Sequence, residues 1–123
     1  MKSEQSDVVL RVIEQLAGVL RHLVEQLGLG APAAAEVVRE AKAAQGELLG
    51  PLSAGLANVD AASAVALLRE QRRVRLWIEF LLVEAAGLRL QGDEAGAVAL
   101  EARALALRAA VDEAYPEPGP SVS

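Results

Sequence analysis

The sequence predicts an all-α protein that folds as an antiparallel bundle of four to five helices. Hydrophobic residues make up 53% of the 123-residue chain but aromatic residues only 2%, so we expect an aliphatic core. Alanine and leucine, the strongest helix formers, supply much of that apolar content. Apolar residues recur at intervals of three and four, and the connections that contain glycine and proline are short, which favours antiparallel neighbours.

A chain of this length is expected to form one domain, which we place at residues 1–115. Residues 116–123, P-E-P-G-P-S-V-S, offer little apolar surface to bury and are predicted to form a disordered tail. No signal peptide is recognisable, and charges interrupt the longest apolar region, residues 8–29. We therefore expect a cytoplasmic protein without a membrane partner. Its ten arginines against two lysines suggest a bacterial genome rich in G and C.

The first helix is predicted to begin after Ser6 and to end at Gly28, with Asp7 in its first turn. One apolar stripe lies along it, and a second, parallel stripe of Leu10, Ala17 and Val24 widens the apolar face. The main stripe consists of Val9, Ile13, Leu16, Leu20, Leu23 and Leu27.

The middle of the chain predicts a weaker helix over residues 33–49, with Pro32 at its start and Gly50 at its end. Residues 51–59 are expected to form a loop or a single turn, and Asp60 to cap a short helix over residues 61–69.

Residues 74–90 are apolar on almost every side, which predicts a helix at the centre of the fold. The last helix is predicted over residues 93–115. It places one apolar stripe on its inner face: Ala97, Leu100, Ala104, Leu107, Val111 and Ala114.

Residues 78–109 resemble one unit of the tetratricopeptide repeat. The positions that carry the resemblance are Leu81, Ala85, Leu88, the turn Gln91-Gly92-Asp93, Ala97, Ala104, Leu105 and Leu107, whereas Glu84, Glu101 and Ala109 depart from the pattern. The resemblance implies a helical hairpin in which Ala85 and Ala97 face each other. No second copy appears about 34 residues upstream, so a superhelix of repeats is not expected. The chain as a whole resembles a family of small bacterial helical proteins that begin with an R-V-I-E-Q-L helix (residues 11–16) and carry no assigned activity.

Three titratable side chains are candidates for a site: His22, Glu79 and Glu84. His22 is the only histidine and is expected to face solvent, because one histidine with scattered carboxylates is a poor metal site. Glu79 and Glu84 interrupt the most apolar helix, about 140° apart around its axis, so they cannot act as one acid–base pair. We expect Arg75 and Arg89 to pair with these two carboxylates.

The one basic cluster consists of Arg69, Arg72, Arg73 and Arg75. Contact with a nucleic acid is one reading of it, but the net charge of −5 and the absence of interleaved aromatic residues favour a solvated bend or salt bridges between subunits.

No catalytic residue, metal site or cofactor is therefore predicted. The apolar content exceeds the usual 45–50%, and surplus apolar faces are commonly covered by another copy or by a partner. We predict a non-enzymatic helical interaction or scaffold module that self-associates, as a dimer, and binds no nucleic acid. The alternative is a small-ligand or metal-binding bundle that uses Glu79, Glu84 and His22.

Overall fold

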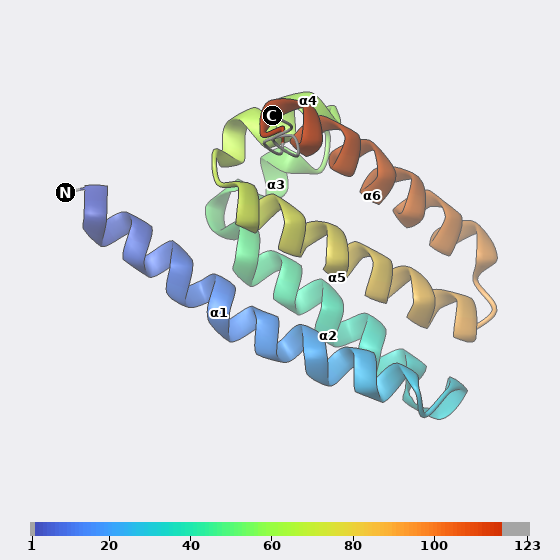
Figure 1. Ribbon diagram of the computed structural model, residues 1–123. Helices are drawn as coiled ribbons and strands as arrows, with labels where there is room; N and C mark the ends of the chain where they lie inside the picture. The colour runs from blue at the N-terminus through green and yellow to red at the C-terminus, as the bar shows by residue number, and fades with distance from the viewer. Residues whose placement is uncertain (1, 117–123) are drawn as a thin grey trace, which may run out of the picture.

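The chain forms a bundle in which the long helices run in alternating directions (Figure 1). The structure is a computed structural model that describes residues 2–116. Its helices are α1 (Lys2–Leu27), α2 (Ala31–Leu49), α3 (Ser53–Leu56), α4 (Ala61–Leu68), α5 (Gln71–Leu90) and α6 (Glu94–Ala114), with a 3-10 turn η1 (Gly50–Leu52) before α3. This confirms the predicted all-α bundle. The tail predicted at residues 116–123 lies, beyond Pro116, outside the described residues.

The connections contain the predicted stop and start residues. Pro32 occupies the first turn of α2, and Gly50 ends that helix with a φ of 57°. Asp60 caps α4 as predicted, because its carboxylate accepts hydrogen bonds from the Ser63 backbone nitrogen at 3.2 Å and from the Ser63 hydroxyl at 2.6 Å. These bonds hold the pKa of Asp60 below its usual value.

A sharp bend separates α4 from α5. Arg69 adopts a left-handed φ of 59° after the last residue of α4. The Glu70 carboxylate then accepts a hydrogen bond from the Arg72 backbone nitrogen at 3.1 Å and caps α5. Since this cap satisfies a free amide of the first turn, α5 begins at Gln71 rather than at the predicted residue 74.

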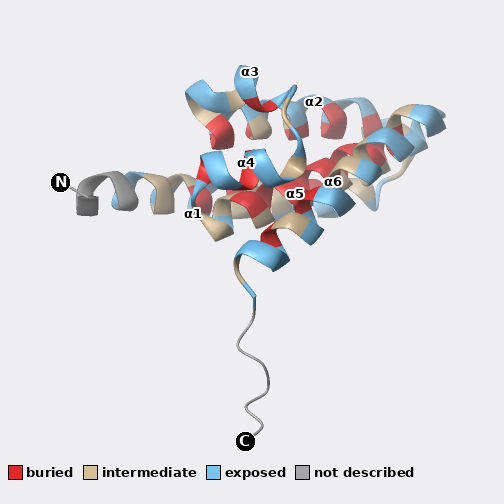
Figure 2. Ribbon diagram, turned by 90° about the horizontal axis from the view of Figure 1, so that it is seen from above, coloured by how far each residue is buried: buried red, intermediate tan, exposed pale blue. Residues whose placement is uncertain are grey.

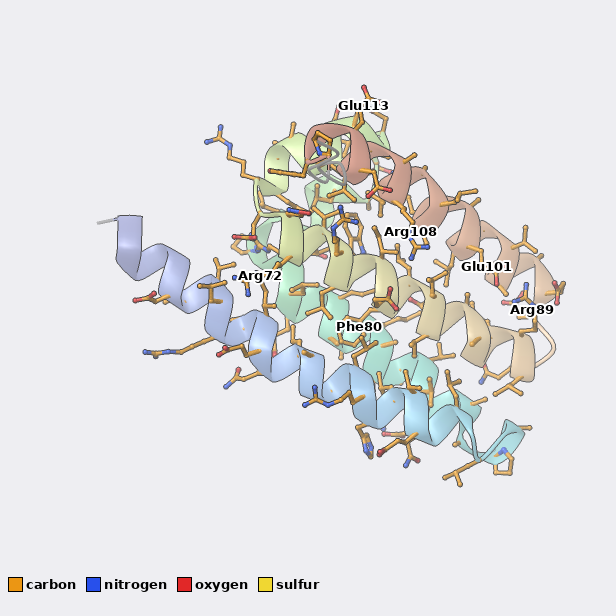
Figure 3. The ribbon with its side chains drawn as sticks, viewed as in Figure 1. Arg72, Phe80, Arg89, Glu101, Arg108 and Glu113 are labelled. Atoms are coloured by element: carbon orange, nitrogen blue, oxygen red, sulfur yellow. The ribbon has the colours of Figure 1, made fainter. Side chains whose placement is uncertain are left out.

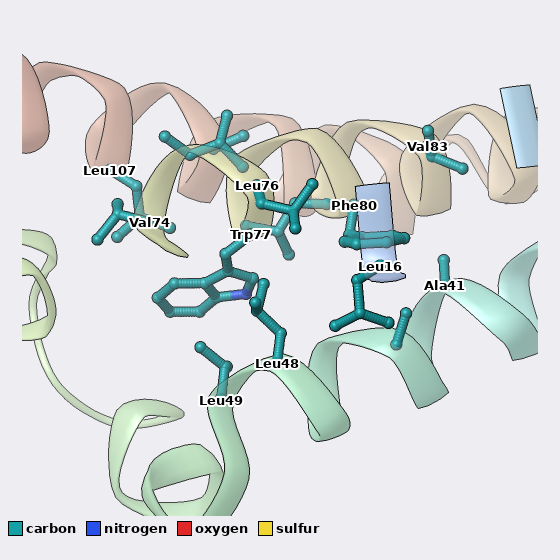
Figure 4. Packing of buried hydrophobic residues seen from close by; sticks show 14 of the residues in the cluster. Leu16, Ala41, Leu48, Leu49, Val74, Leu76, Trp77, Phe80, Val83 and Leu107 are labelled. Carbon is teal, nitrogen blue, oxygen red and sulfur yellow. The ribbon is translucent and has the colours of Figure 1, made fainter. Parts of the chain in front are cut away.

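Helix α5 lies at the centre of the fold, as its apolar sequence predicted. It packs against α1, α2, α4 and α6. Phe80 is completely buried, and Trp77 is also buried, at 5% exposure. Figure 4 shows these rings facing Leu48 of α2 and Leu16 of α1, within an otherwise aliphatic core.

Helix α1 covers α2 and α5 from one side of the bundle. It begins at Lys2 rather than after Ser6, and its N-terminal end projects beyond the other helices (Figure 1). Ile13, Leu16 and Leu23 are buried, whereas Val24 of the parallel stripe stays 54% exposed. Among the described helices, none has both the length and the apolar content that crossing a bilayer requires.

Candidate functional site

The three candidate site residues, His22, Glu79 and Glu84, do not come together in the structure. His22 is exposed on α1, as predicted. The Glu79 carboxylate faces Arg108 of α6 at 3.7 Å, whereas the buried Glu84 accepts a hydrogen bond from the Gln45 amide of α2 at 2.7 Å. Among the side chains that the structure describes, residues 7–116, no group of three or more histidine, aspartate or glutamate residues is placed to hold a metal ion.

The expected ion pairs within α5 are wrong. Arg75 contacts Asp112 of α6 at 2.9 Å instead of Glu79. Arg89 contacts both Glu94, at 2.9 Å, and Glu101 of α6. Sequence spacing alone missed these partners, because α6 packs along this side of α5 and brings carboxylates nearer than those on α5 itself.

The basic cluster is divided between structural and solvent-facing side chains. The Arg73 guanidinium donates hydrogen bonds to the carbonyl oxygens of Leu48, at 2.8 Å, and Leu49, at 3.1 Å, and so caps the end of α2. Partial burial there lowers the pKa of Arg73. Arg69 and Arg72 are exposed; Figure 3 shows Arg72 near the first turn of α5. Through Arg73, the segment between α4 and α5 therefore also connects α5 to the end of α2.

An open groove of about 350 Å³ lies between α2, α3, α5 and α6. Trp77 and Leu81 contribute to its apolar lining, and Lys42 and Arg103 bring two cations. The Arg103 guanidinium lies 5.5 Å from the centre of the Trp77 ring and donates to the Leu56 carbonyl oxygen at 3.0 Å. Arg103 is thus held inward, against α3 and α5.

The most unusual surface is the outer side of α6. Between Ala95 and Leu107, every exposed residue of this helix is alanine, valine or leucine. Leu105 is 70% exposed, and Val98 is 51% exposed. With the neighbouring alanines they form what we call the α6 outer face, whose exposed segments recur along this helix in Figure 2. It consists of Ala95, Val98, Ala99, Ala102, Leu105, Ala106 and Ala109.

The spacing of these seven residues keeps them on one side of the helix. From Ala95 to Ala109 the face is about 21 Å long, at 1.5 Å per residue. The outer side of α1 is different, since Arg11, Glu14 and Arg21 interrupt its exposed apolar residues. A continuous exposed apolar face is typical of a surface that contacts another molecule.

A charged rim borders the α6 outer face on the side of α5. Glu94, Glu101 and Arg108 line this edge, and each contacts α5 or its last turn. Figure 3 shows Arg89 and Glu101 side by side at one end of the hairpin and Arg108 further along α6. An apolar centre with a polar rim is the usual composition of a protein interface.

The hairpin that presents this face is closed at its turn. The Asp93 backbone nitrogen donates to the Leu88 carbonyl oxygen at 2.9 Å, and the Asp93 carboxylate caps α6 by accepting from the Gly96 nitrogen at 2.9 Å. Ala85 and Ala97 are fully buried, and Ala95 is exposed. No protein family, curated protein or solved structure matches the chain, so the likeness to a tetratricopeptide unit stays a prediction.

A seven-residue repeat in the sequence marks the α6 outer face. Ala95, Ala102 and Ala109 recur at seven-residue intervals, and Val98 and Leu105 repeat the same interval between them. Five of the seven residues of this face are alanines, which are small and strong helix formers, so their pattern alone does not distinguish an exposed face from a buried one. Only the burial of each residue in the structure separates the two faces.

Proposed function

We propose that the protein is a non-enzymatic helical interaction module that self-associates through the α6 outer face. The observation that carries the proposal is the run of exposed apolar residues on α6, with Leu105 and Val98 at its centre. Removing this apolar surface from water would favour the association of two chains. A location in the bacterial cytoplasm and a scaffold role for the dimer belong to the same proposal.

The test is the solution mass measured by light scattering after size exclusion, at tens of micromolar and after tenfold dilution. We expect a mass near twice the 12.9 kDa of one chain. Val98→Glu should shift the protein to a monomer, because it places a charge at the centre of the interface.

The matched control is Val24→Glu on α1. Val24 and Val98 are the same residue type, each in a helix, with exposed fractions of 54% and 51%. Val24→Glu should keep the dimer mass. If the unmodified protein is a monomer at every concentration, self-association is wrong. If both variants dissociate equally, the α6 outer face has no special role.

A small-ligand function is the second candidate, favoured by the groove beside Trp77 rather than by Glu79, Glu84 and His22. Its apolar lining and the two cations, Lys42 and Arg103, suit an amphiphilic carboxylate. Octanoate is a simple probe, and fluorescence of Trp77, the only tryptophan, reports on the groove directly. Saturable quenching by octanoate that Arg103→Met weakens would support this function. No saturation up to millimolar octanoate would count against it.

A further inference from the structure

The seven positions of the α6 outer face are symmetric about Ala102, and each large side chain has an alanine at its mirror position. Alanines lie seven residues to either side of it, at Ala95 and Ala109. The two large residues are Val98, four positions before Ala102, and Leu105, three positions after it. Their mirror positions about Ala102 are held by the alanines at 106 and 99.

This order of sizes fits an antiparallel copy of the same helix. With Ala102 opposite Ala102 of a second copy, each Leu105 meets an alanine at position 99, and each Val98 meets an alanine at position 106. Large side chains that face small ones interdigitate without voids. A parallel alignment would instead place leucine against leucine and valine against valine, and leave the alanines facing alanines.

The rim adds charge complementarity to this fit. Glu94 lies eight residues before Ala102 and Arg108 six residues after it, on the same edge of α6. In the antiparallel arrangement, that edge meets the same edge of the second copy, so each Glu94 lies near the Arg108 of the other chain. Within each chain Glu94 already contacts Arg89, and Arg108 contacts Glu79, so the contacts between chains extend these ion pairs across the interface. Glu101, which falls near the axis, contacts Arg89 within its own chain.

We infer that two copies of this chain pair through α6 in an antiparallel, two-fold arrangement centred on Ala102. The inference rests on the proposed self-association and adds to it the partner helix, its direction and its register. The small side chains along the axis allow the two helices to approach at the short end of the usual 8–10 Å range.

Cysteine cross-linking tests this geometry cleanly, because the chain contains no cysteine. We would prepare Ala95→Cys, Ala102→Cys and Ala109→Cys, all at exposed positions, and oxidise each under mild conditions. Ala102→Cys should form a covalent dimer. Ala95→Cys alone should not, because its two copies would lie about 21 Å apart along the axis, beyond the roughly 7 Å Cα separation that a disulfide spans.

Mixing the Ala95→Cys and Ala109→Cys proteins should then give a cross-linked heterodimer, since these positions lie opposite each other. Ala35→Cys, exposed on α2, measures cross-linking by random collision. Homodimer cross-links at all three α6 positions would establish a parallel pairing and overturn the inference. A dimer mass with cross-links no faster than those of Ala35→Cys would move the interface elsewhere and leave self-association intact. A monomer mass would remove both proposals.

Discussion

Helix α5 packs against α2 and against α6 in different ways. On the side of α2, Gly87 brings the two backbones together: a Cβ atom at this position would lie 2.8 Å from Cγ2 of Val38 and 3.4 Å from the Ala34 carbonyl oxygen. Ala85 of α5 and Ala97 of α6 are both fully buried, and the likeness to a tetratricopeptide unit predicts that they face each other between these helices. The contact with α2 therefore has no room for a methyl group, whereas the predicted contact with α6 already contains two.

The polar contacts of α5 are also more buried on the side of α2 than on the side of α6. Across α2 and α5, the Gln45–Glu84 hydrogen bond is partly buried, and Glu84 as a whole is only 5% exposed. Across α5 and α6, ion pairs such as Arg75–Asp112 and Arg89–Glu94 lie on an exposed rim. Exposed pairs contribute little to stability, whereas a buried polar group left without a partner is costly. We therefore expect substitutions between α2 and α5 to lower stability more than substitutions between α5 and α6.

The largest effect is expected where a side chain is added to the contact between α2 and α5. Gly87→Leu should lower the free energy of unfolding by about 3 kcal/mol, the upper end of the range for overpacking, because even its Cβ atom clashes. Chemical denaturation at low protein concentration would measure the loss. Gly46→Leu is the control, since a Cβ there meets nothing within 4 Å. Equal losses in both variants would mean that α2 and α5 are not closely packed at Gly87.

The α6 contact should respond more mildly. Ala85→Leu and Ala97→Leu should each destabilise by about 2 kcal/mol, because both positions are fully buried. If the two alanines touch, as the likeness to a tetratricopeptide unit implies, the double variant will not be additive. Ala95→Leu, on the exposed side of α6, should be nearly neutral in the same denaturation experiment. Similar losses in all three would refute the predicted hairpin contact.

The polar link across α2 and α5 should have the next effect. Gln45→Ala should lower stability by about 1–2 kcal/mol, because the buried Glu84 carboxyl group loses the amide that donates to it. The double variant Gln45→Leu/Glu84→Leu removes both polar groups and should recover most of that loss in thermal unfolding. A double variant as unstable as Gln45→Ala would show that the loss comes from packing and not from an unpaired carboxyl group.

Local sequence patterns predicted the helices themselves better than the contacts between them. Helical spacing and the glycine and proline positions predicted the order of the longer helices, and the apolar run of residues 74–90 predicted the central helix. Local signals of this kind act within one or two turns of a helix. The first turn of α5 was missed because Glu70 caps it through its side chain, in a segment that is polar on every face.

The partners of charged residues could not be predicted in the same way. Arg75, Arg89 and Glu84 were assigned partners along α5, but each has a partner outside that helix. Such choices depend on how two helices are rotated about their axes, which sequence spacing does not determine. Gly87 is a similar case: its close approach to Val38 follows from where α2 crosses α5. The α6 outer face could not be predicted because the sequence does not show which alanines are exposed and which are buried.

The smallest effect is expected at the rim of the α6 contact, where Arg89 holds two carboxylates. Its guanidinium donates to Glu94 at 2.9 and 3.0 Å and to Glu101 at 2.6 and 2.9 Å. These hydrogen bonds lower the pKa of both glutamates. A group with a lowered pKa in the folded state contributes stability above its unfolded pKa of about 4.3, and the contribution disappears as the pH falls through the folded value.

Arg89→Gln should therefore lower the melting temperature slightly at pH 7, and the difference from the unmodified protein should vanish as the pH falls below about 4. The effect stays small because all three side chains are substantially exposed, at 40%, 66% and 41% for Arg89, Glu94 and Glu101. Arg72→Gln removes an exposed arginine at the other end of α5 and controls for the change in net charge. A difference for Arg89→Gln that persists at pH 3 would mean that the arginine stabilises the hairpin by packing its aliphatic stem, so that this side of α5, too, depends on close contact rather than on its exposed charges.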